Sequence, residues 1–391
     1  MAPHLVVAVE RKDCRACGST DLVSVLDLKD QPLANRFLTR QQLAKPEPRY
    51  PLHMVRCARC GLCQLTHVVD PEVLYRDYAY QSGFSEGWLQ HCGALAVELA
   101  ERYPGGSVLD VAANDGSLLR ACRGRGLRVQ GVDPARNLDH GDLPITREFW
   151  PVDLGERFDV IVAQNVFGHV DDARGFLQGI AGALQEGGVA IIECPWLVDL
   201  IRHCRWDTIY HEHLSYWGLC PLLRLAREVG LQAEKVWVYP DLHGGTMRVY
   251  LKQGSDDLFG SWGVKDMAQE EGRRLTEDAF LEFGLKASVQ RNQWADYFRS
   301  ARGVAAYGAS AKFNTLLNAL PERPPLMGIF DDNPSKWDRY TPGWHIPVLC
   351  PSIMSFASIQ ELLVGAPNWI SVIEPKAREL GFTGRVKSVW G

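Results

Sequence analysis

The stretch "GSVLDVAANDGSLLRACRGRG", residues 106–126, decides the fold. Its apolar run Ser107–Val111 predicts a strand, the small residues after it predict a tight turn, and the spacing beyond predicts a helix that ends in glycines. A second strand in "LRVQGVDPARN" ends at Asp133. Repeated strand–helix units predict an open, mostly parallel sheet that binds ligands at the carboxyl ends of its strands.

Two further apolar runs extend this pattern. "FDVIVAQNVFGHV" and "GGVAIIECPW" each predict a strand, and the residues from about Asp172 to Leu184 predict a helix between them. Asn165 and His169 follow the first of these strands. They either contact a ligand at the sheet edge or cap the following helix.

The turn "AANDG", residues 112–116, indicates which ligand binds. It lacks the G-x-G-x-x-G of dinucleotide folds and the G-K-[ST] of triphosphate loops. Carboxylates beside the turn would repel a pyrophosphate, whereas an acid about 20 residues on can accept ribose hydroxyls. This pattern suits S-adenosylmethionine, with its ribose and cationic amino-acid tail. The residues predicted to bind it here are Asp110, Asn114, Asp115, Gly116 and Asp133, with Asn165 and His169 as candidates.

Two C-x2-C-G motifs near the start of the chain predict a metal site. "CRACG" carries Cys14 and Cys17, and "CARCG" carries Cys57 and Cys60. Each motif places two thiolates on one turn, so the pair completes a four-thiolate zinc site. A closed shell of four thiolates predicts a structural zinc rather than a catalytic one.

Composition bounds the class of protein. The chain has 391 residues, which predicts two or three domains, and its 46% hydrophobic and 23% charged residues are typical of a globular protein. A net charge of −5 without a long basic run argues against a nucleic-acid partner. No apolar run approaches the roughly 20 residues of a membrane span, and "MAPHLVVAVERKD" lacks the features of a signal peptide. We expect a cytoplasmic protein with no membrane partner.

Several separated motifs resemble one known family. "VLDVAANDGSLL", "VIVAQNVFGHVDD", "WDTIYHEHLSYW" and "LHGGTMRVY" look like the sugar C-methyltransferases, enzymes that methylate a carbon of nucleotide-linked deoxysugars. The resemblance includes "PLANRFL" in the cysteine-bearing region, and "YGASAKFNTLLN" and "DDNPSKWDRYTPGWHIPV" towards the C-terminus. It runs from about Cys14 to Val348.

The resemblance and the strand pattern together imply an α/β fold: a doubly wound methyltransferase sheet with an N-terminal zinc-binding module and a C-terminal Rossmann-like domain. We expect the zinc-binding module at 1–75 and the methyltransferase domain at 76–255. A helical linker is expected at 256–300, and a nucleotide-sugar-binding domain at 301–391. The implied cofactors are S-adenosylmethionine and structural zinc, and the implied substrate is a nucleotide-linked sugar.

The segment "WDTIYHEHLSYW", residues 206–217, concentrates acid, base and phenol. Methylating a carbon beside a ketone requires a base at the C–H bond, donors for the developing oxyanion, and the sulfonium methyl opposite. Neutral imidazole suits the base, and the resemblance assigns that role to His213. It also implies that Tyr210 and Glu212 contact the sugar.

The segment before the methyltransferase domain, "YRDYAYQSGFSEGW", supplies further candidates. The resemblance implies that a tyrosine from it reaches the site, and of Tyr75, Tyr78 and Tyr80 we favour the last two. Ser85 is a candidate contact for the methyl donor.

Two other interpretations of the His-Glu-His run stay open at this point. The residues could ligate a catalytic metal, although the i, i+4 spacing of H-E-x-x-H is missing. They could also form a buried structural cluster, with His211 fixing the neighbouring loop.

The remaining candidates lie further along the chain. "DLHGGTMRVY" predicts a glycine turn that opens a strand, where Gly244 and Gly245 would admit a sugar diphosphate, His243 would bind the sugar and Arg248 would neutralise charge; a plain hairpin is the alternative. A second strand–turn–helix pattern at 304–320 puts Lys312 beside helix-terminal amides, an arrangement that binds phosphate. The substrate-binding residues predicted there are Lys312, Asn314 and Asp331.

One departure from the family bears on that pocket. Phe313 stands where the family usually has glycine, and its ring could narrow the phosphate pocket or indicate a different handle on the substrate. Three alternatives to carbon methylation remain: methylation of oxygen, isomerisation or reduction of the keto sugar, and a non-catalytic scaffold that binds nucleotide sugars.

Overall fold

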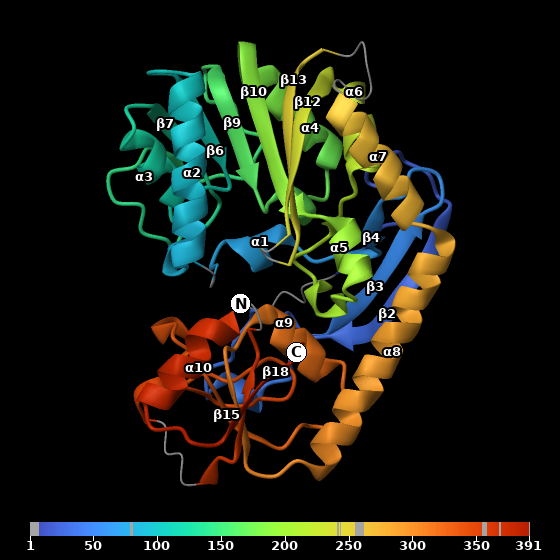
Figure 1. The fold of residues 1–391 in the computed structure, drawn as a ribbon, viewed down its shortest axis with the longest axis vertical. Coiled ribbons are helices and arrows are strands. Elements are labelled where there is room, and N and C mark those ends of the chain that lie inside the picture. The colour runs from blue at the N-terminus through green and yellow to red at the C-terminus, as the bar shows by residue number, and fades with distance from the viewer. Residues whose placement is uncertain are drawn as a thin grey trace.

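The computed structural model of the chain describes residues 8–78, 81–240, 242, 244–254, 262–353, 358–366 and 369–390. Three parts are visible in Figure 1: a large sheet with its helices at the top, an antiparallel module in blue at the right, and a smaller parallel sheet at the bottom. Tyr80 and His243, both predicted site residues, lie outside the described residues.

The central domain contains a seven-stranded sheet. Its β13 is antiparallel to both neighbours and the other pairs are parallel. The predicted strands at 107–111 and before Asp133 are confirmed. In sheet order the strands are β12 (Leu231–Tyr239), β13 (Thr246–Gln253), β10 (Leu184–Pro195), β9 (Phe158–Gln164), β6 (Ser107–Val111), β7 (Arg128–Val132) and β8 (Ile145–Thr146).

Helices cover both faces of this sheet. Val108 and Val162 pack with α2 and α3, whereas their strand neighbours Leu109 and Ala163 pack with α4 and α6. Because side chains alternate across a strand, a sheet buried on both faces needs the continuous apolar runs read from the sequence. The doubly wound fold is confirmed. The helices of this part are α2 (Glu86–Arg102), α3 (Ser117–Arg123), η3 (Phe167–His169), α4 (Ala173–Ala183), α5 (Leu197–Arg202), η4 (Trp206–Thr208), α6 (Leu219–Glu228) and α7 (Trp262–Arg274).

The N-terminal module is built on an antiparallel sheet in the order β11-β4-β3-β2. Three strands come from the module itself, but β11 (Ser215–Tyr216) belongs to the histidine-rich segment 150 residues away in the chain. The zinc-binding module therefore holds the candidate catalytic segment as its edge strand. Its other elements are β1 (Val9–Glu10), β2 (Leu22–Gln31), η1 (Gln42–Ala44), β3 (Tyr50–Cys57), β4 (Cys63–Leu65), β5 (His67–Val68), α1 (Pro71–Tyr75) and η2 (Ser82–Phe84).

The C-terminal domain has a five-stranded parallel sheet in the order β16-β15-β14-β17-β18. The long helix α8 runs from the upper domain along β2 and β3 to this sheet (Figure 1). None of the helices in the described ranges is long and apolar enough to cross a membrane. The elements are α8 (Glu277–Ser300), β14 (Val304–Tyr307), α9 (Ala311–Asn318), β15 (Leu326–Phe330), η5 (Pro334–Lys336), β16 (Val348–Leu349), η6 (Pro351–Ile353), β17 (Glu361–Val364), α10 (Ile370–Glu379) and β18 (Arg385–Ser388).

Candidate active site

The first β-α turn lies at the carboxyl end of β6 in a conformation that small residues permit. Ala112, Asn114 and Gly116 have positive φ angles of 62°, 49° and 82°. A side chain at Gly116 would collide with Leu143, so glycine is required by space as well as by backbone conformation. The turn brings its backbone to the sheet edge where we predict the methyl donor.

Two buried carboxylates flank this turn. Asp133 accepts hydrogen bonds from the backbone N–H of Asn114 at 2.8 Å and of Ala135 at 2.9 Å. Burial, together with the charges of Asp133 and Asp115, holds the pKa of Asp110 well above its ordinary value. A cation bound here would relieve that repulsion, so this edge favours a cationic ligand.

Asp115 and Ser85 contact the protein itself. The Asp115 carboxylate accepts hydrogen bonds from Gly83 N at 2.6 Å and from the Ser82 hydroxyl at 3.1 Å. Ser85 caps α2 by accepting from Trp88 N at 3.1 Å. These contacts hold the segment 82–85 against the turn, a role that differs from the direct donor contact predicted for both residues.

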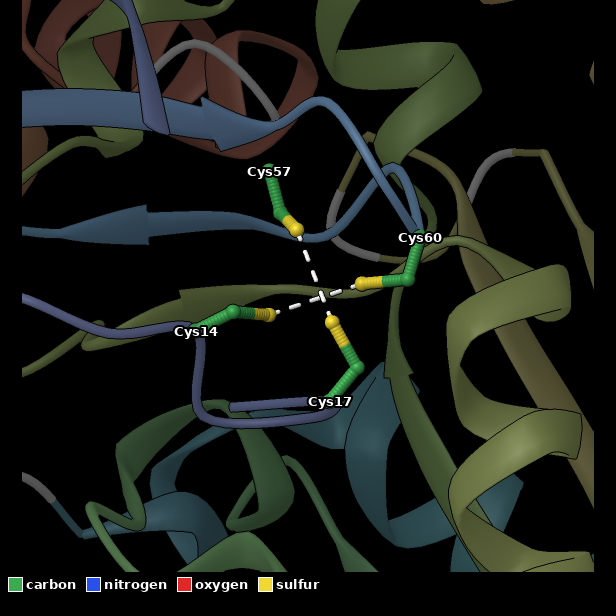
Figure 2. Close-up of side chains that lie close together, drawn as sticks. All are labelled: Cys14, Cys17, Cys57 and Cys60. Carbon is green, nitrogen blue, oxygen red and sulfur yellow. Dashed lines mark hydrogen bonds between the residues drawn. The ribbon is translucent and has the colours of Figure 1, made fainter. Parts of the chain in front are cut away.

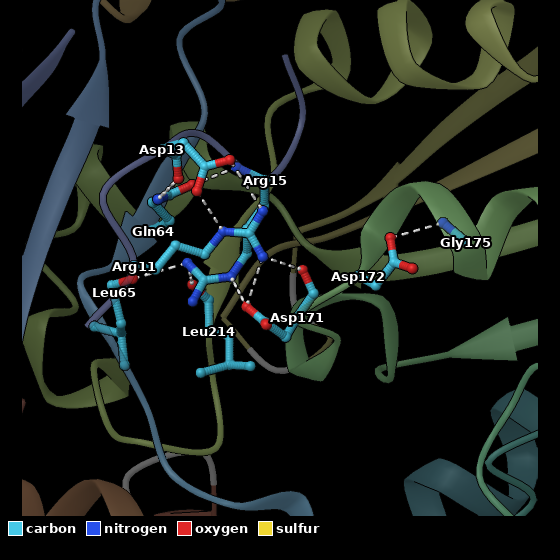
Figure 3. A network of polar contacts seen from close by, with 9 residues as sticks. All are labelled: Arg11, Asp13, Arg15, Gln64, Leu65, Asp171, Asp172, Gly175 and Leu214. Carbon is cyan, nitrogen blue, oxygen red and sulfur yellow. Dashed lines mark hydrogen bonds and ion pairs between the residues drawn. The ribbon is translucent and has the colours of Figure 1, made fainter. Parts of the chain in front are cut away.

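Asn165 and His169 follow β9 but do not cap α4. The cap is Asp172, which accepts from Gly175 N at 2.9 Å (Figure 3), so the capping alternative was wrong. The side-chain Oδ1 of Asn165 is buried and has no hydrogen-bond partner among the described residues. Such an acceptor is costly unless a ligand satisfies it.

The imidazoles of His169 and His213 stack on each other with their ring centroids 5.1 Å apart. The ring of Tyr75 also stacks on His169, with centroids 5.8 Å apart, and the centroid of the Tyr210 ring lies 4.0 Å from that of His213. Burial lowers the pKa of His169 to about 4. At neutral pH His169 is therefore an uncharged neighbour and does not repel a protonated His213.

One hydrogen bond fixes the tautomer of His213. Its Nδ1 lies 2.8 Å from the backbone carbonyl oxygen of Thr208. A carbonyl can only accept, so Nδ1 carries the hydrogen and the basic lone pair of the neutral ring is on Nε2. The ring is partly exposed, as an imidazole that exchanges a proton with a substrate needs to be.

Glu212 is buried beside it and is held from the N-terminal module. The side-chain amide of Asn35 donates to both carboxylate oxygens, at 2.8 and 2.9 Å, and the Tyr78 hydroxyl donates to one of them at 3.4 Å. Burial raises the pKa of Glu212 to about 7, although these hydrogen bonds act in the opposite direction. The carboxyl group can thus hold or release a proton near neutral pH.

The His-Glu-His run does not form a metal site in the part of the chain that the structure describes. His211 is buried and its Nε2 donates to the Tyr50 carbonyl in β3 at 3.1 Å, whereas His213 turns towards Thr208. This contact joins the His211 ring to the start of β3 in the N-terminal module.

The prediction for Arg248 is wrong. Its guanidinium is buried in the seven-stranded sheet, and its Nε donates to Glu193 at 2.6 Å. Its charge is therefore matched by a carboxylate within the protein and does not face a substrate. At the hairpin before it, Gly244 and Gly245 have φ angles of 88° and 110°, and a side chain at Gly245 would collide with Asp199.

The C-terminal candidates divide into two groups. Asp331, at the end of β15, accepts from Ala309 N at 2.8 Å and from Lys336 Nζ at 3.1 Å. Lys312 is partly exposed near Asp207, and burial lowers its pKa. Both residues lie at the carboxyl edge of the smaller sheet, where α9 begins.

Asn314 and Phe313 face into the protein. Asn314 is fully buried and its amide donates to the Ala34 carbonyl at 2.8 Å, which ties α9 to the N-terminal module, while its Oδ1 has no hydrogen-bond partner among the described residues. The Phe313 ring is buried in the core against Gly365. It therefore fills the core and does not narrow a phosphate pocket.

The sequence interpretation missed Asn35 and Glu193. Asn35 lies within "PLANRFL", a stretch that the family resemblance highlighted without giving it a role. Glu193 is an acid inside an otherwise apolar strand, an uncommon residue that signals a buried partner. The sequence could therefore have indicated that Glu193 has a buried partner. Only the tertiary structure identifies that partner as Arg248.

The four predicted cysteines come together, with their sulfur atoms pointing toward one another (Figure 2). All four Sγ atoms lie within 4.8 Å of one another, and Cys14 Sγ is 3.4 Å from Cys60 Sγ while Cys17 Sγ is 3.6 Å from Cys57 Sγ. Tetrahedral zinc with Zn–S bonds of about 2.3 Å requires sulfur–sulfur distances of about 3.8 Å. The cluster therefore fits zinc.

Three family models match the chain in order. Residues 14–75 match a model described as "Putative zinc binding domain", residues 89–236 a "Methyltransferase domain", and residues 241–383 a "C-methyltransferase C-terminal domain". The chain is thus an S-adenosylmethionine-dependent methyltransferase.

A curated relative makes the class more specific. The C-methyltransferase NovU of Streptomyces niveus is 31% identical over 361 residues, which cover 87% of this chain and 86% of NovU. The chain belongs to this C-methyltransferase family, as the sequence motifs implied. Its acceptor atom is therefore carbon, in place of the oxygen and non-catalytic alternatives.

Solved methyltransferase structures are similar to part of the chain at lower identity. A methyltransferase from Clostridium acetobutylicum ATCC 824 is 10% identical, with 42% of this chain and 92% of that one covered and a TM-score of 0.34. The magnesium protoporphyrin IX methyltransferase ChlM of Synechocystis PCC 6803 is 14% identical, with 43% and 84% covered and a TM-score of 0.36.

Proposed function

We propose that this enzyme methylates the carbon next to the ketone, C3, of a nucleotide-linked 4-keto-deoxysugar, with His213 as the general base. The observation that carries the proposal is the Thr208 carbonyl at Nδ1 of His213, which fixes the basic lone pair on Nε2. The stacked neutral ring of His169 keeps the imidazole in place.

The chemistry balances with few groups. His213 Nε2 takes the proton from C3, and the electron pair of the C–H bond enters an enolate whose charge rests on the ketone oxygen. The carbon would form its new bond to the electrophilic methyl group that bound S-adenosylmethionine would supply, as the S–CH3 bond breaks and its electron pair stays on sulfur to leave S-adenosylhomocysteine. The phenol of Tyr210 is the proposed donor to the developing oxyanion, and Tyr78 is proposed to act through Glu212, to which its hydroxyl donates.

Glu212 completes the proposed sugar site. Its pKa near 7 lets it take part in proton movement, and its hydrogen bond from Tyr78 orients that phenol. Asn35 holds both of its oxygens, so the carboxyl group keeps one orientation while its protonation changes.

The methyl donor and the nucleotide diphosphate are proposed to bind at the carboxyl edges of the two parallel sheets, one at each sheet. Asp110, Asp133 and the unpartnered Asn165 Oδ1 support binding of the cationic methyl donor at the larger sheet. Lys312 supports binding of the nucleotide diphosphate at the smaller sheet. The cytoplasm remains the proposed compartment, and neither nucleic acid nor membrane is a proposed partner.

Proton exchange in deuterated water tests the base. The probe is dTDP-4-keto-6-deoxyglucose with S-adenosylhomocysteine in place of the methyl donor, so that no methyl transfer can occur. We expect the wild-type enzyme to exchange the C3 proton and His213→Asn to do so roughly 10²–10⁴-fold more slowly. Asparagine keeps an N–H near the Nδ1 position but has no base at Nε2, so an unchanged exchange rate would contradict the assignment.

Metal analysis tests the proposed structural zinc. We expect one zinc per chain in the purified protein and loss of that zinc in the Cys14→Ser, Cys57→Ser double variant. Cys63→Ser is the matched control, because Cys63 is buried in β4 and is not part of the cluster. Full zinc content in the double variant would rule out the four-cysteine site.

A further inference from the structure

Arg15 is a buried arginine in an unexpected place, between the two cysteines of the first C-x2-C motif. Its side chain has 0% exposure. A buried guanidinium destabilises a fold unless it is paired and hydrogen-bonded. The metal-binding loop does not require a charged residue at this position. The role of Arg15 is therefore inferred from its hydrogen-bond partners.

Arg15 contacts residues inside and outside the zinc-binding module (Figure 3). Arg15 Nε donates to the Asp171 carboxylate at 2.9 Å, and Nη1 donates to the backbone carbonyls of Leu65 at 2.8 Å and Leu214 at 3.3 Å. The Arg15 backbone N–H donates to the Gln64 side chain at 2.8 Å, which fixes the start of the side chain. One guanidinium thus joins three separate segments.

Two of these segments carry the stacked imidazoles. Asp171 follows His169 by two residues, and Leu214 follows His213 directly. The third segment, β4, pairs with β11, and β11 follows His213 in the same histidine-bearing run. Arg15 therefore sits at the point where the loops of His169 and His213 meet the cysteine cluster.

We propose that Arg15 is a positioning residue for the methylation site: it sets the spacing of His169 and His213 and makes that spacing depend on the metal-binding loop. The inference rests on the proposed function, because it assumes that His213 is the base. The backbone of residues 14–17 is bent around the four sulfur atoms, so a metal there fixes the origin of the Arg15 side chain. A structural metal would in this way contribute to the geometry of a distant base.

Arg11 provides a matched control. Its Nη1 donates to the same Asp171 carboxylate at 3.1 Å, and its side chain is 25% exposed. No hydrogen bond between Arg11 and the 206–217 segment occurs among the described residues. Replacing Arg11 removes a charge from the same carboxylate but leaves the link to Leu214.

The experiment compares Arg15→Gln, Arg15→Lys and Arg11→Gln in the full-length, zinc-loaded enzyme. We expect Arg15→Gln to slow C3 proton exchange roughly 10–100-fold, since small misplacements of a reacting group have effects of that size. The zinc content of Arg15→Gln and its affinity for S-adenosylhomocysteine should stay within about twofold of wild type. In Arg11→Gln the zinc content, this affinity and the exchange rate should all stay within about twofold of wild type. Arg15→Lys, which keeps the charge and one donor, should recover part of the rate.

A second measurement does not depend on the reaction. The imidazole ¹⁵N shifts of His169 and His213 should move in Arg15→Gln and stay in Arg11→Gln. Absence of exchange in the wild-type enzyme would refute the proposed base while these shifts still tested Arg15. Unchanged shifts and exchange in Arg15→Gln, equal losses in both glutamine variants, or loss of zinc and folding in both Arg15 variants would each overturn the positioning role.

Discussion

The two parallel sheets share one loop arrangement but differ in the charged side chains around it. In the larger sheet, Asp133 accepts hydrogen bonds from two backbone N–H groups, that of Asn114 in the first turn at 2.8 Å and that of Ala135 at 2.9 Å. In the smaller sheet, Asp331 does the same with Ala309 and Asn333, at 2.8 and 2.9 Å. The backbone frame is thus the same in both domains.

The surroundings of the two aspartates differ. Asp110 and Asp115 lie near Asp133, whereas Lys336 binds Asp331 and Lys312 starts the helix beside it. We propose the first edge as the site of the cationic methyl donor and the second as the site of the anionic diphosphate. The comparison teaches that a common fold leaves ligand choice to a few charged side chains.

The largest expected effect comes from replacing the two equivalent aspartates. Asp133→Asn should weaken S-adenosylmethionine binding roughly 10–100-fold, because it loses a charged acceptor worth about 1.5–3 kcal/mol. Asp331→Asn should leave that affinity within about twofold. Isothermal titration calorimetry measures both, and equal weakening by the two variants would mean that the sheets do not divide the ligands.

A smaller effect is expected at the lysine-bearing edge. Lys312→Met should weaken binding of thymidine diphosphate about tenfold, the loss of one charge-assisted contact of about 1.4 kcal/mol, without changing affinity for the methyl donor. Lys286→Met is the control, since Lys286 is exposed on α8 and pairs with Glu282. A nucleotide affinity unaffected by Lys312→Met would place the diphosphate elsewhere.

The smallest effect concerns stability and pH. Because the folded-state pKa of Asp110 is raised, ionising it opposes folding, and this cost grows as pH rises above the unfolded value of about 3.9. Asp110→Asn should therefore raise the melting temperature of the ligand-free enzyme by a few degrees at pH 8 and less at pH 5. Thermal denaturation at the two pH values checks this, and a gain that is larger at pH 5 would contradict the sign.

The sequence by itself determined the fold and one complete site. Local apolar runs and turns gave β6, the helix after it and the second strand–turn–helix pattern at β14, because strands buried on both faces must be apolar. The cysteine spacing predicted the four-cysteine cluster, since each C-x2-C motif is a local turn. Asp133 was predictable for the same reason, as its position relative to the first strand is set by one βα unit.

Only the tertiary structure decided which groups meet across long separations. Asn35 with Glu212, Arg15 with Leu214, and Arg248 with Glu193 lie 177, 199 and 55 residues apart. Their pairing follows from β11 joining the N-terminal sheet and from β13 lying antiparallel to β10. The prediction for Arg248 failed for this reason: a sequence shows that a side chain is polar, but burial and partners decide whether it serves a ligand or the fold.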